Sequence, residues 1–179
     1  MQTMVSIQTY ESPIGTLLLA ADEVGLCGLW LSGEKQFADN LPAEHVWQST
    51  PVLAKAQQWL DIYFSSKEPD FMPPLHPVGS AFRQAVWQQL LQIPNGKTVT
   101  YGQLAKQRGI LRMSAQAVGG AVGHNKISII IPCHRVVGAG GNLTGYAGGI
   151  DRKIMLLELE GVDLRGLYVP KKGNGIVTG

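Results

Sequence analysis

The adjacent residues Cys133 and His134 form the side-chain pair best suited to nucleophilic chemistry. The thiolate is the nucleophilic form of cysteine, and a neighbouring base or cation favours it. Cys133 follows a hydrophobic run and Pro132, and His134 and Arg135 come directly after it. Because adjacent side chains on a regular strand point to opposite faces, cooperation between Cys133 and His134 requires a bend or a bridging water. From spacing alone, a purely structural cysteine remains an alternative.

The other cysteine, Cys27, gives a different prediction. It lies in the apolar stretch Val-Gly-Leu-Cys-Gly-Leu-Trp, so we expect a buried and inert thiol.

The N-terminus shows no basic region followed by an apolar one, which predicts no export signal and a cytoplasmic protein. Two cysteines in such a protein do not predict a disulfide framework. We expect no metal, because the cysteines show no ligand spacing with any of the four histidines, His45, His76, His124 and His134.

Residues 71–150 point to nucleic acid through their charge. This segment holds seven Lys and Arg and no Asp or Glu, whereas residues 1–70 hold three Lys and Arg against nine Asp and Glu. Because no carboxylate balances these cations, the segment is expected to carry a positive electrostatic potential, as on a surface that binds phosphate. A weakly basic domain with an uncharged, glutamine-rich surface is the alternative.

With 45% hydrophobic residues the 179-residue chain is not a disordered one, and no apolar run is long enough to span a membrane.

The N-terminal part of the chain reads as a small sheet followed by a helix. Residues 4–9, 16–21 and 26–31 are short β-rich runs separated by turn residues, which predicts an antiparallel meander. Thr50 then caps a helix that has Pro51 in its first turn and apolar residues at helical spacing up to Phe64. Residues 68–79 contain four prolines and are expected to form a linker at a domain boundary.

The C-terminal part reads mostly as helices. Ser80 caps a helix that ends near residues 94–96, Thr100 caps one from Tyr101 to Arg108, and Ser114 caps one from 115 to about 124. The two short helices fit a helix-turn-helix, with an ordinary helical hairpin as the alternative. A β-branched run at 127–131 precedes Cys133, and a last amphipathic helix covers 151–160.

The helix at 115–124 is unusual for a protein that reads bases. Its side chains are almost all small, and only Gln116 could reach a base edge. A helix with so small a face lets its backbone approach a partner closely, which suits sequence-independent binding in the minor groove. Tight helix packing inside the protein is the alternative.

Taken together, these residues resemble the O6-alkylguanine-DNA alkyltransferases, a family of direct-reversal DNA repair proteins. The N-terminal half resembles the family loosely, chiefly through Ser12-Pro13-Ile14-Gly15. In the C-terminal half the matching motifs stand in family order and cover nearly half of the chain: 80–82, 101–105, 117–121, Asn125, 131–136, 144–149, Lys153 and 156–161.

The resemblance implies an α/β (α+β) protein with two domains. Residues 1–75 would form an RNase H-like domain, an antiparallel sheet with a helix, that ends in the proline-rich linker. Residues 76–168 would form a mostly helical, winged helix-turn-helix-like domain that binds DNA and carries the alkyl acceptor. Residues 169–179 are expected to be a flexible tail.

The implied activity is a single, irreversible transfer. The damaged nucleotide is flipped out of double-stranded DNA, and the alkyl group of O6-alkylguanine passes to Cys133; O4-alkylthymine is a further candidate substrate. The resemblance implies no cofactor, no membrane and no obligate protein partner, so a monomer is expected.

The family's catalytic residues fall on five positions of this chain. Cys133 would accept the alkyl group, and His134 would take its proton through a water. Glu160 would hold the imidazole in the useful tautomer, as in other nucleophile–base–orienter arrangements. Asn125 would fix the hinge between the helix-turn-helix and the active-site run. Tyr101 would donate to the base or position the adjacent phosphate.

The resemblance also implies a pocket for the flipped base. The backbones of Cys133 and Val136 would meet the exocyclic amine, Tyr146 would form a wall, and the N–H of Ala147 would face O6. Ser128 stands at a pocket position where some members have proline.

Most residues expected to face DNA lie on the helix at 115–124, which we call the small-faced helix because its side chains are almost all small. Gln116 stands where the family often has an arginine that fills the gap left by the flipped base, so Arg112, one turn earlier, is expected to help. Some members hold zinc in the N-terminal domain, and that ligand set is not found in this sequence. The full DNA-facing set is Arg112, Ser114, Ala115, Gln116, Ala117, Gly119, Gly120, Gly123 and Arg135.

Three other functions compete with this one. A non-catalytic protein that binds alkyl lesions and flags them for other repair would share the domain but lack the acceptor, and Cys133 argues against it. A transcriptional regulator would need a sensor domain and base-reading side chains. A Cys-His hydrolase would explain neither the absence of Asp and Glu from residues 71–150 nor the small-faced helix.

Overall fold

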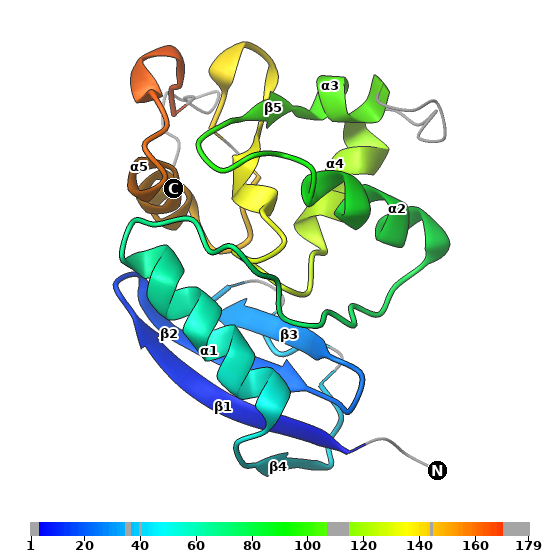
Figure 1. Cartoon of the computed structure of the whole chain (residues 1–179). Coiled ribbons are helices and arrows are strands. Elements are labelled where there is room, and N and C mark those ends of the chain that lie inside the picture. Colours follow the sequence, from blue (N-terminus) through cyan, green and yellow to red (C-terminus); the bar gives the residue numbers. More distant parts are fainter. Residues whose placement is uncertain (1–3, 35–36, 40, 107–114, 144, 170–179) are drawn as a thin grey trace. The chain divides into compact units, whose positions relative to one another are not determined.

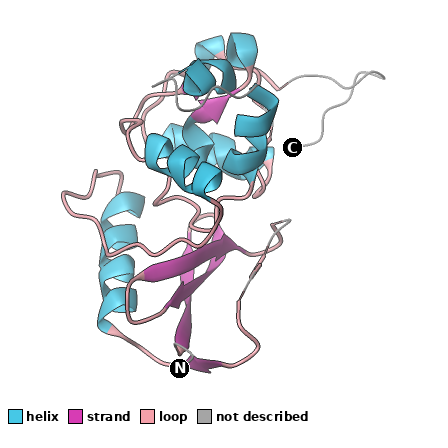
Figure 2. Cartoon of the chain, turned by 90° about the vertical axis from the view of Figure 1, so that its right-hand side faces the viewer, coloured by secondary structure: helices cyan, strands magenta, loops and turns pink. Residues whose placement is uncertain are grey.

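The computed structural model describes residues 4–34, 37–39, 41–106, 115–143 and 145–169. The chain divides into two compact units, one formed by Met1–Val78 with Lys126–Ser128 and the other by Gly79–Asn125 with Ile129–Gly179. Strands dominate the first unit and helices the second (Figure 2). Among the described helices, none is both long and apolar enough to cross a membrane.

The first unit is built on a four-stranded sheet with the order β3-β2-β1-β4. Strands β1 (Val5–Ser12), β2 (Gly15–Ala21) and β3 (Leu26–Leu31) pair antiparallel, which confirms the predicted meander (Figure 1). The short strand β4 (His45–Trp47) pairs parallel to β1 at the sheet edge and was not predicted.

Helix α1 (Pro51–Phe64) lies along this sheet (Figure 1). It begins where expected, because the hydroxyl of Thr50 accepts a hydrogen bond from the Leu53 N–H at 3.2 Å. The Tyr10 hydroxyl of β1 donates to Asp61 of the helix at 2.6 Å. On the sheet itself one buried cluster gathers alternate residues of neighbouring strands: Val5, Ile7, Leu18, Ala20 and Trp30.

The proline-rich segment 68–79, predicted as a linker, is attached to the first unit. The N–H of Leu26 donates to the Pro74 carbonyl at 2.7 Å, and the N–H of His76 donates to the Leu26 carbonyl at 2.7 Å. His76 Nδ1 also lies 2.6 Å from a carboxylate oxygen of Asp22. The backbone of this segment therefore continues the pairing at the start of β3.

The second unit is mostly helical, as the sequence predicts. The Ser80 hydroxyl caps the first helix by accepting from the Arg83 N–H at 3.2 Å. Thr100 and Gln103 form a reciprocal capping box at the start of the next, with distances of 2.8 and 3.0 Å. Its helices are α2 (Ala81–Leu90), α3 (Tyr101–Lys106), α4 (Ala115–Gly123) and α5 (Ile150–Leu159).

One contact joins α2 to α4, and a strand pair reaches the segment that carries Cys133. The indole N–H of Trp87 on α2 donates to the Ala121 carbonyl of α4 at 3.0 Å. Strand β5 (Val99–Thr100) pairs parallel with β6 (Val136–Val137), which follows Cys133 directly in the chain. Residues 107–114, which include the predicted cap Ser114, and residues 170–179 lie outside the described residues. The fold prediction of an α/β chain with an N-terminal sheet and a helical C-terminal part is confirmed.

Candidate functional site

The backbone bends sharply at Cys133, as cooperation with His134 requires. Pro132 has φ −82° and ψ 66°, and the Cys133 N–H donates to the Ile131 carbonyl at 2.8 Å, so the proline is the centre of an inverse γ-turn. One turn of 3₁₀ helix follows, η1 (Cys133–Arg135), and all three of its side chains are buried. The preceding β-branched run forms turns rather than a strand, with Ile127 alone in a bridge to Leu29.

His134 and Glu160 are in direct contact, as the resemblance implies. Nε2 of the fully buried His134 lies 2.6 Å from a carboxylate oxygen of Glu160, whose side chain is 1% exposed. A carboxylate can only accept, so Nε2 carries the proton of the neutral ring and Nδ1 keeps a lone pair. In the part of the chain that the structure describes, Nδ1 of His134 has no hydrogen-bond partner. It is therefore the nitrogen that can take a proton.

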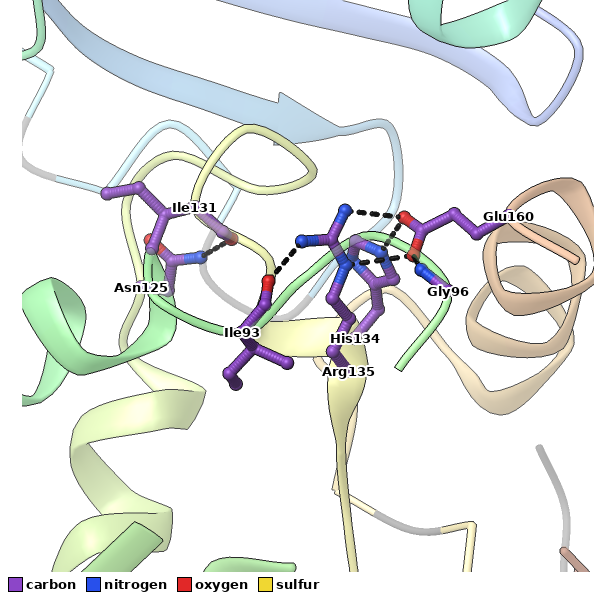
Figure 3. A network of polar contacts seen from close by, with 7 residues as sticks. All are labelled: Ile93, Gly96, Asn125, Ile131, His134, Arg135 and Glu160. Carbon is purple, nitrogen blue, oxygen red and sulfur yellow. Dashed lines mark hydrogen bonds and ion pairs between the residues drawn. The ribbon is translucent and has the colours of Figure 1, made fainter. Parts of the chain in front are cut away.

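Arg135 shares the Glu160 carboxylate with His134 (Figure 3). Its Nε and Nη2 donate to the two carboxylate oxygens at 2.8 and 3.1 Å, and its Nη1 donates to the Ile93 carbonyl at 2.7 Å. The Gly96 N–H adds a longer contact to Glu160 at 3.3 Å. Arg135 is among the residues expected to face DNA, but its side chain is 10% exposed and its guanidinium is engaged inside the unit.

These contacts shift the pKa values of both groups in useful directions. Burial lowers the pKa of His134, and the charges of Arg135 and Lys153 act in the same direction against the pull of Glu160. Burial alone would raise the pKa of Glu160, but hydrogen bonds and charge from His134 and Arg135 hold it well below its usual range. The pair therefore combines a neutral imidazole with an ionised carboxylate at neutral pH.

Lys153 is a functional candidate that matched the family pattern in the sequence but was given no role there. It is fully buried on α5, and its ammonium donates to the Val136 carbonyl at 2.6 Å. Burial lowers its pKa to about 8, while the charge of Cys133 acts in the opposite direction. The ammonium and a Cys133 thiolate therefore stabilise each other. The sequence indicates the burial of Lys153, since this residue lies on the apolar face of its helix with Ile150 and Leu157.

Tyr101 is placed to donate a hydrogen bond. Burial and, to a smaller extent, the charge of Cys133 together raise the pKa of Tyr101 to about 12, so the phenol keeps its proton at neutral pH. Two glycines leave room beside it. A Cβ added at Gly145 would lie 2.8 Å from the Tyr101 hydroxyl, and one at Gly119 would lie 3.6 Å from the ring. Gly145 also has φ +81°, a second reason for glycine there.

Asn125 fixes the backbone just before Cys133. Its amide Nδ2 donates to the Ile131 carbonyl at 2.8 Å (Figure 3). The same carbonyl accepts the Cys133 N–H. The side chain is buried at the point where the chain leaves α4. The hinge role that the resemblance implies for Asn125 stays a prediction.

The predicted pocket residues are only partly brought together. The Cys133 carbonyl accepts a hydrogen bond from the Val136 N–H, and the Val136 carbonyl accepts one from Lys153. Tyr146 is buried and Ala147 half-buried in the loop before α5. Ser128 groups with the first unit, where its N–H donates to the Leu29 carbonyl. The pocket roles of these residues stay predictions.

The small-faced helix α4 presents an open surface. Ala115, Gln116 and Gly120 are exposed, and Ala117 is half-buried. A Cβ at Gly120 or Gly123 would meet nothing within 4 Å among the described residues. Packing against the described residues therefore does not require glycine at these two positions, and a close approach of α4 to DNA stays a prediction. Arg112 lies outside the described residues.

The positive charge of segment 71–150 is smaller than its composition indicates. Arg135 is neutralised by Glu160, and Lys126 lies 2.6 Å from Asp39. Both carboxylates come from outside that segment, which sequence counting could not show. Among the described residues, no three His, Cys, Asp or Glu side chains lie close enough to hold a metal ion.

Comparison with known proteins identifies the relatives of this chain. Residues 5–77 match the family model of the 6-O-methylguanine DNA methyltransferase ribonuclease-like domain, and residues 81–162 match that of its DNA binding domain. The methylated-DNA–protein-cysteine methyltransferase of Methanosarcina acetivorans is 44% identical over 85% of this chain and 96% of its own. The protein of the same name from Mycobacterium bovis is 44% identical over 88% of this chain and 93% of its own. The crystal structure of Mycobacterium tuberculosis OGT in complex with DNA matches with a TM-score of 0.77 and 42% identity, covering 87% of this chain and 92% of that one.

Proposed function

Because the chain belongs to the 6-O-methylguanine DNA methyltransferase family, we propose that it repairs O6-alkylguanine in double-stranded DNA by transferring the alkyl group, once and irreversibly, to Sγ of its own Cys133. The observation that carries this proposal is the buried chain of contacts beside Cys133, in which Glu160 holds His134 at 2.6 Å and Arg135 holds Glu160. It supplies a neutral base next to a nucleophile.

His134, Cys133 and Tyr101 each have one role in the proposed reaction. Nδ1 of His134 takes the proton of the Cys133 thiol through a bridging water, and the thiolate sulfur attacks the alkyl carbon. An S–C bond forms while the C–O6 bond breaks, and the electron pair of that bond goes to O6 of guanine. Tyr101, kept protonated by its raised pKa, donates toward the base as this charge develops. The guanine anion then gains a proton from Tyr101, and the proton held by His134 replaces the one that Tyr101 has given up. The products are unmodified guanine and an S-alkylated Cys133, so the protein acts once.

Lys153 and Glu160 supply the electrostatics of the site. The Lys153 ammonium favours the thiolate form of Cys133 before attack, since opposite charges in a buried site interact more strongly than in water. Glu160 stabilises the imidazolium that forms on His134 when it takes the proton.

Helix α4 is proposed to meet the minor groove while the base is extruded. A base inside the stack cannot present O6 to a thiolate, so flipping must come first. The exposed small residues of α4 allow a close approach of backbone to DNA, and Gln116 on its first turn is the side chain long enough to enter the gap. O4-alkylthymine is a further candidate substrate.

We further propose that a monomer working in the cytoplasm carries out this repair. The predicted division of labour is a ribonuclease-like domain over 1–75 and a DNA-binding, acceptor-bearing domain over 76–168. The lesion-flagging alternative is not favoured, because the named relatives are methyltransferases and Cys133 stands within the matched DNA binding domain.

Two cysteine variants test the assignment of the acceptor. Cys133→Ala is expected to abolish transfer of a labelled methyl group from an O6-methylguanine duplex, while its affinity for the duplex stays within about threefold. Cys27→Ala is the matched control and should transfer normally, since burial raises the pKa of the Cys27 thiol to about 11. Transfer that persists in Cys133→Ala, or is lost in Cys27→Ala, would overturn the assignment.

A further inference from the structure

The three residues Lys126–Ser128 stand apart from the rest of the acceptor segment. In the chain they join Asn125 to Ile129, yet they group with the first unit. The Leu29 N–H of β3 donates to the Lys126 carbonyl at 2.9 Å, and the Ser128 N–H donates to the Leu29 carbonyl at 3.0 Å. Between them Ile127 forms a parallel bridge with Leu29. We call residues 126–128, held in this way, the tether.

An ion pair strengthens the tether. The ammonium of Lys126 lies 2.6 Å from a carboxylate oxygen of Asp39, and the Lys126 side chain is only 6% exposed whereas that of Asp39 is 40% exposed. A lysine that is nearly removed from water needs a counter-charge, and this geometry supplies one. Asp39 therefore fixes a side chain of the tether as well as compensating its charge.

A strained residue follows the tether directly. Ile129 has φ +72° and is fully buried. The left-handed region is unfavourable for a β-branched residue, so this conformation persists only where the surrounding structure imposes it. The tether holds the chain on the N-terminal side of Ile129, and the hydrogen bond from Asn125 to the Ile131 carbonyl holds it on the other side.

Cys133 depends on the same short stretch of backbone. Its N–H donates to the Ile131 carbonyl at 2.8 Å, two residues after Ile129. Release of the tether would let Ile129 relax toward an ordinary backbone conformation, and the carbonyl that holds Cys133 would move with it.

From these contacts we propose that Asp39 and Lys126 are positioning residues for alkyl transfer, because their ion pair holds the strained backbone that places Cys133. This inference rests on the proposed function for the identity of the reaction. It predicts that changes in the N-terminal sheet unit alter the chemical step without altering the affinity for DNA.

The test compares single-turnover methyl transfer and duplex affinity for two variants with the wild type. Asp39→Asn and Lys126→Met are each expected to lower the rate constant about tenfold and to leave the dissociation constant for an O6-methylguanine duplex within twofold. The double variant should be no slower than either single one, and Asp39→Glu should restore most of the rate. Asp163→Asn is the matched control, because it removes a carboxylate from the exposed pair with Arg165 and should change neither value.

Hydrogen exchange supplies a readout that does not depend on the reaction. The amides of Ser128 and Cys133 are expected to exchange faster in Asp39→Asn and Lys126→Met than in the wild type, since both donate hydrogen bonds in this segment.

Several results would overturn the proposal. One is a transfer rate within twofold of the wild type in both variants. Another is a fall in rate confined to Asp39→Asn, because the cause would then be an uncompensated ammonium rather than a lost tether. A loss of affinity that matches the loss of rate would assign the pair to DNA binding. If the wild type itself gained no methyl group, the proposed function would fail, and exchange at Ser128 and Cys133 would still decide whether the tether exists.

Discussion

Replacing Arg135 with methionine removes the cation that shares the Glu160 carboxylate with His134. Methionine fills much of the same apolar space but makes none of the guanidinium hydrogen bonds to Glu160 and Ile93. The Glu160 side chain is 1% exposed, so water cannot take over the lost contacts.

The effect on stability follows from this burial. Removing one partner of a buried ion pair costs about 3–5 kcal/mol, and we expect about 3 kcal/mol here because His134 can gain a proton and compensate part of the charge. The pKa of Glu160 lies below its unfolded value, so its stabilisation is complete above about pH 4.5 and is lost as pH falls through the folded pKa. The deficit of Arg135→Met should therefore be largest near pH 7 and shrink in acid.

The effect on the reaction follows from His134. Arg135 helps to lower the pKa of His134, so its removal should raise that pKa and protonate the base at higher pH. A rise of about one pKa unit lowers the neutral fraction of the imidazole about tenfold on the acid side of the profile. We expect the transfer rate of Arg135→Met to fall more at pH 6 than at pH 8.

Two measurements check these expectations. Denaturant unfolding at pH 7 gives the change in stability, and single-turnover transfer across pH 5.5–8.5 gives the shift of the acid limb. Arg165→Met, which removes a cation 91% exposed to solvent, is the control and should change stability by less than about 0.5 kcal/mol. An Arg135→Met protein of wild-type stability and unchanged pH profile would refute the reasoning. A lowered salt dependence of DNA binding, by a slope of about one, would return Arg135 to the DNA-facing set.

Three further substitutions test other parts of the site. Lys153→Met should slow transfer about tenfold near pH 7, and it should remove the decline in rate that we expect for the wild type as the Lys153 ammonium loses its proton above about pH 8; an unchanged single-turnover pH profile would contradict this. Asn125→Ala leaves the buried Ile131 carbonyl without its side-chain donor and should cost about 1–2 kcal/mol in denaturant unfolding, together with a slower transfer. Gln116→Arg should speed repair where flipping limits the rate, and an equal rate would mean that Gln116 does not fill the gap left by the base.

Local chemistry made much of the fold predictable. Thr50, Ser80 and Thr100 cap helices because a hydroxyl before an apolar run satisfies free N–H groups within three residues, and this pattern can be read from sequence. The parallel strand β4 was missed because three residues are too few to show an alternating pattern, and its pairing depends on β1 about 40 residues away.

The candidate site was predictable mainly through family resemblance. Nothing in the spacing of Glu160 links it to His134, 26 residues earlier, and only the fold brings them together. For the same reason Arg135 was placed toward DNA, since its partner could not be seen in a segment without carboxylates. Lys153 matched the family pattern and lay on an apolar helix face, but the sequence assigned it no role. The clearance that Gly145 gives Tyr101 required coordinates.

The most direct test of the account is the mass of the protein after mixing with a duplex that carries one O6-methylguanine. We predict a gain of one methyl group per protein, located on the peptide that contains Cys133 and unchanged by further addition of substrate. Tight binding of the lesion duplex without any gain in mass would contradict the account and place the protein among those that bind lesions without repairing them.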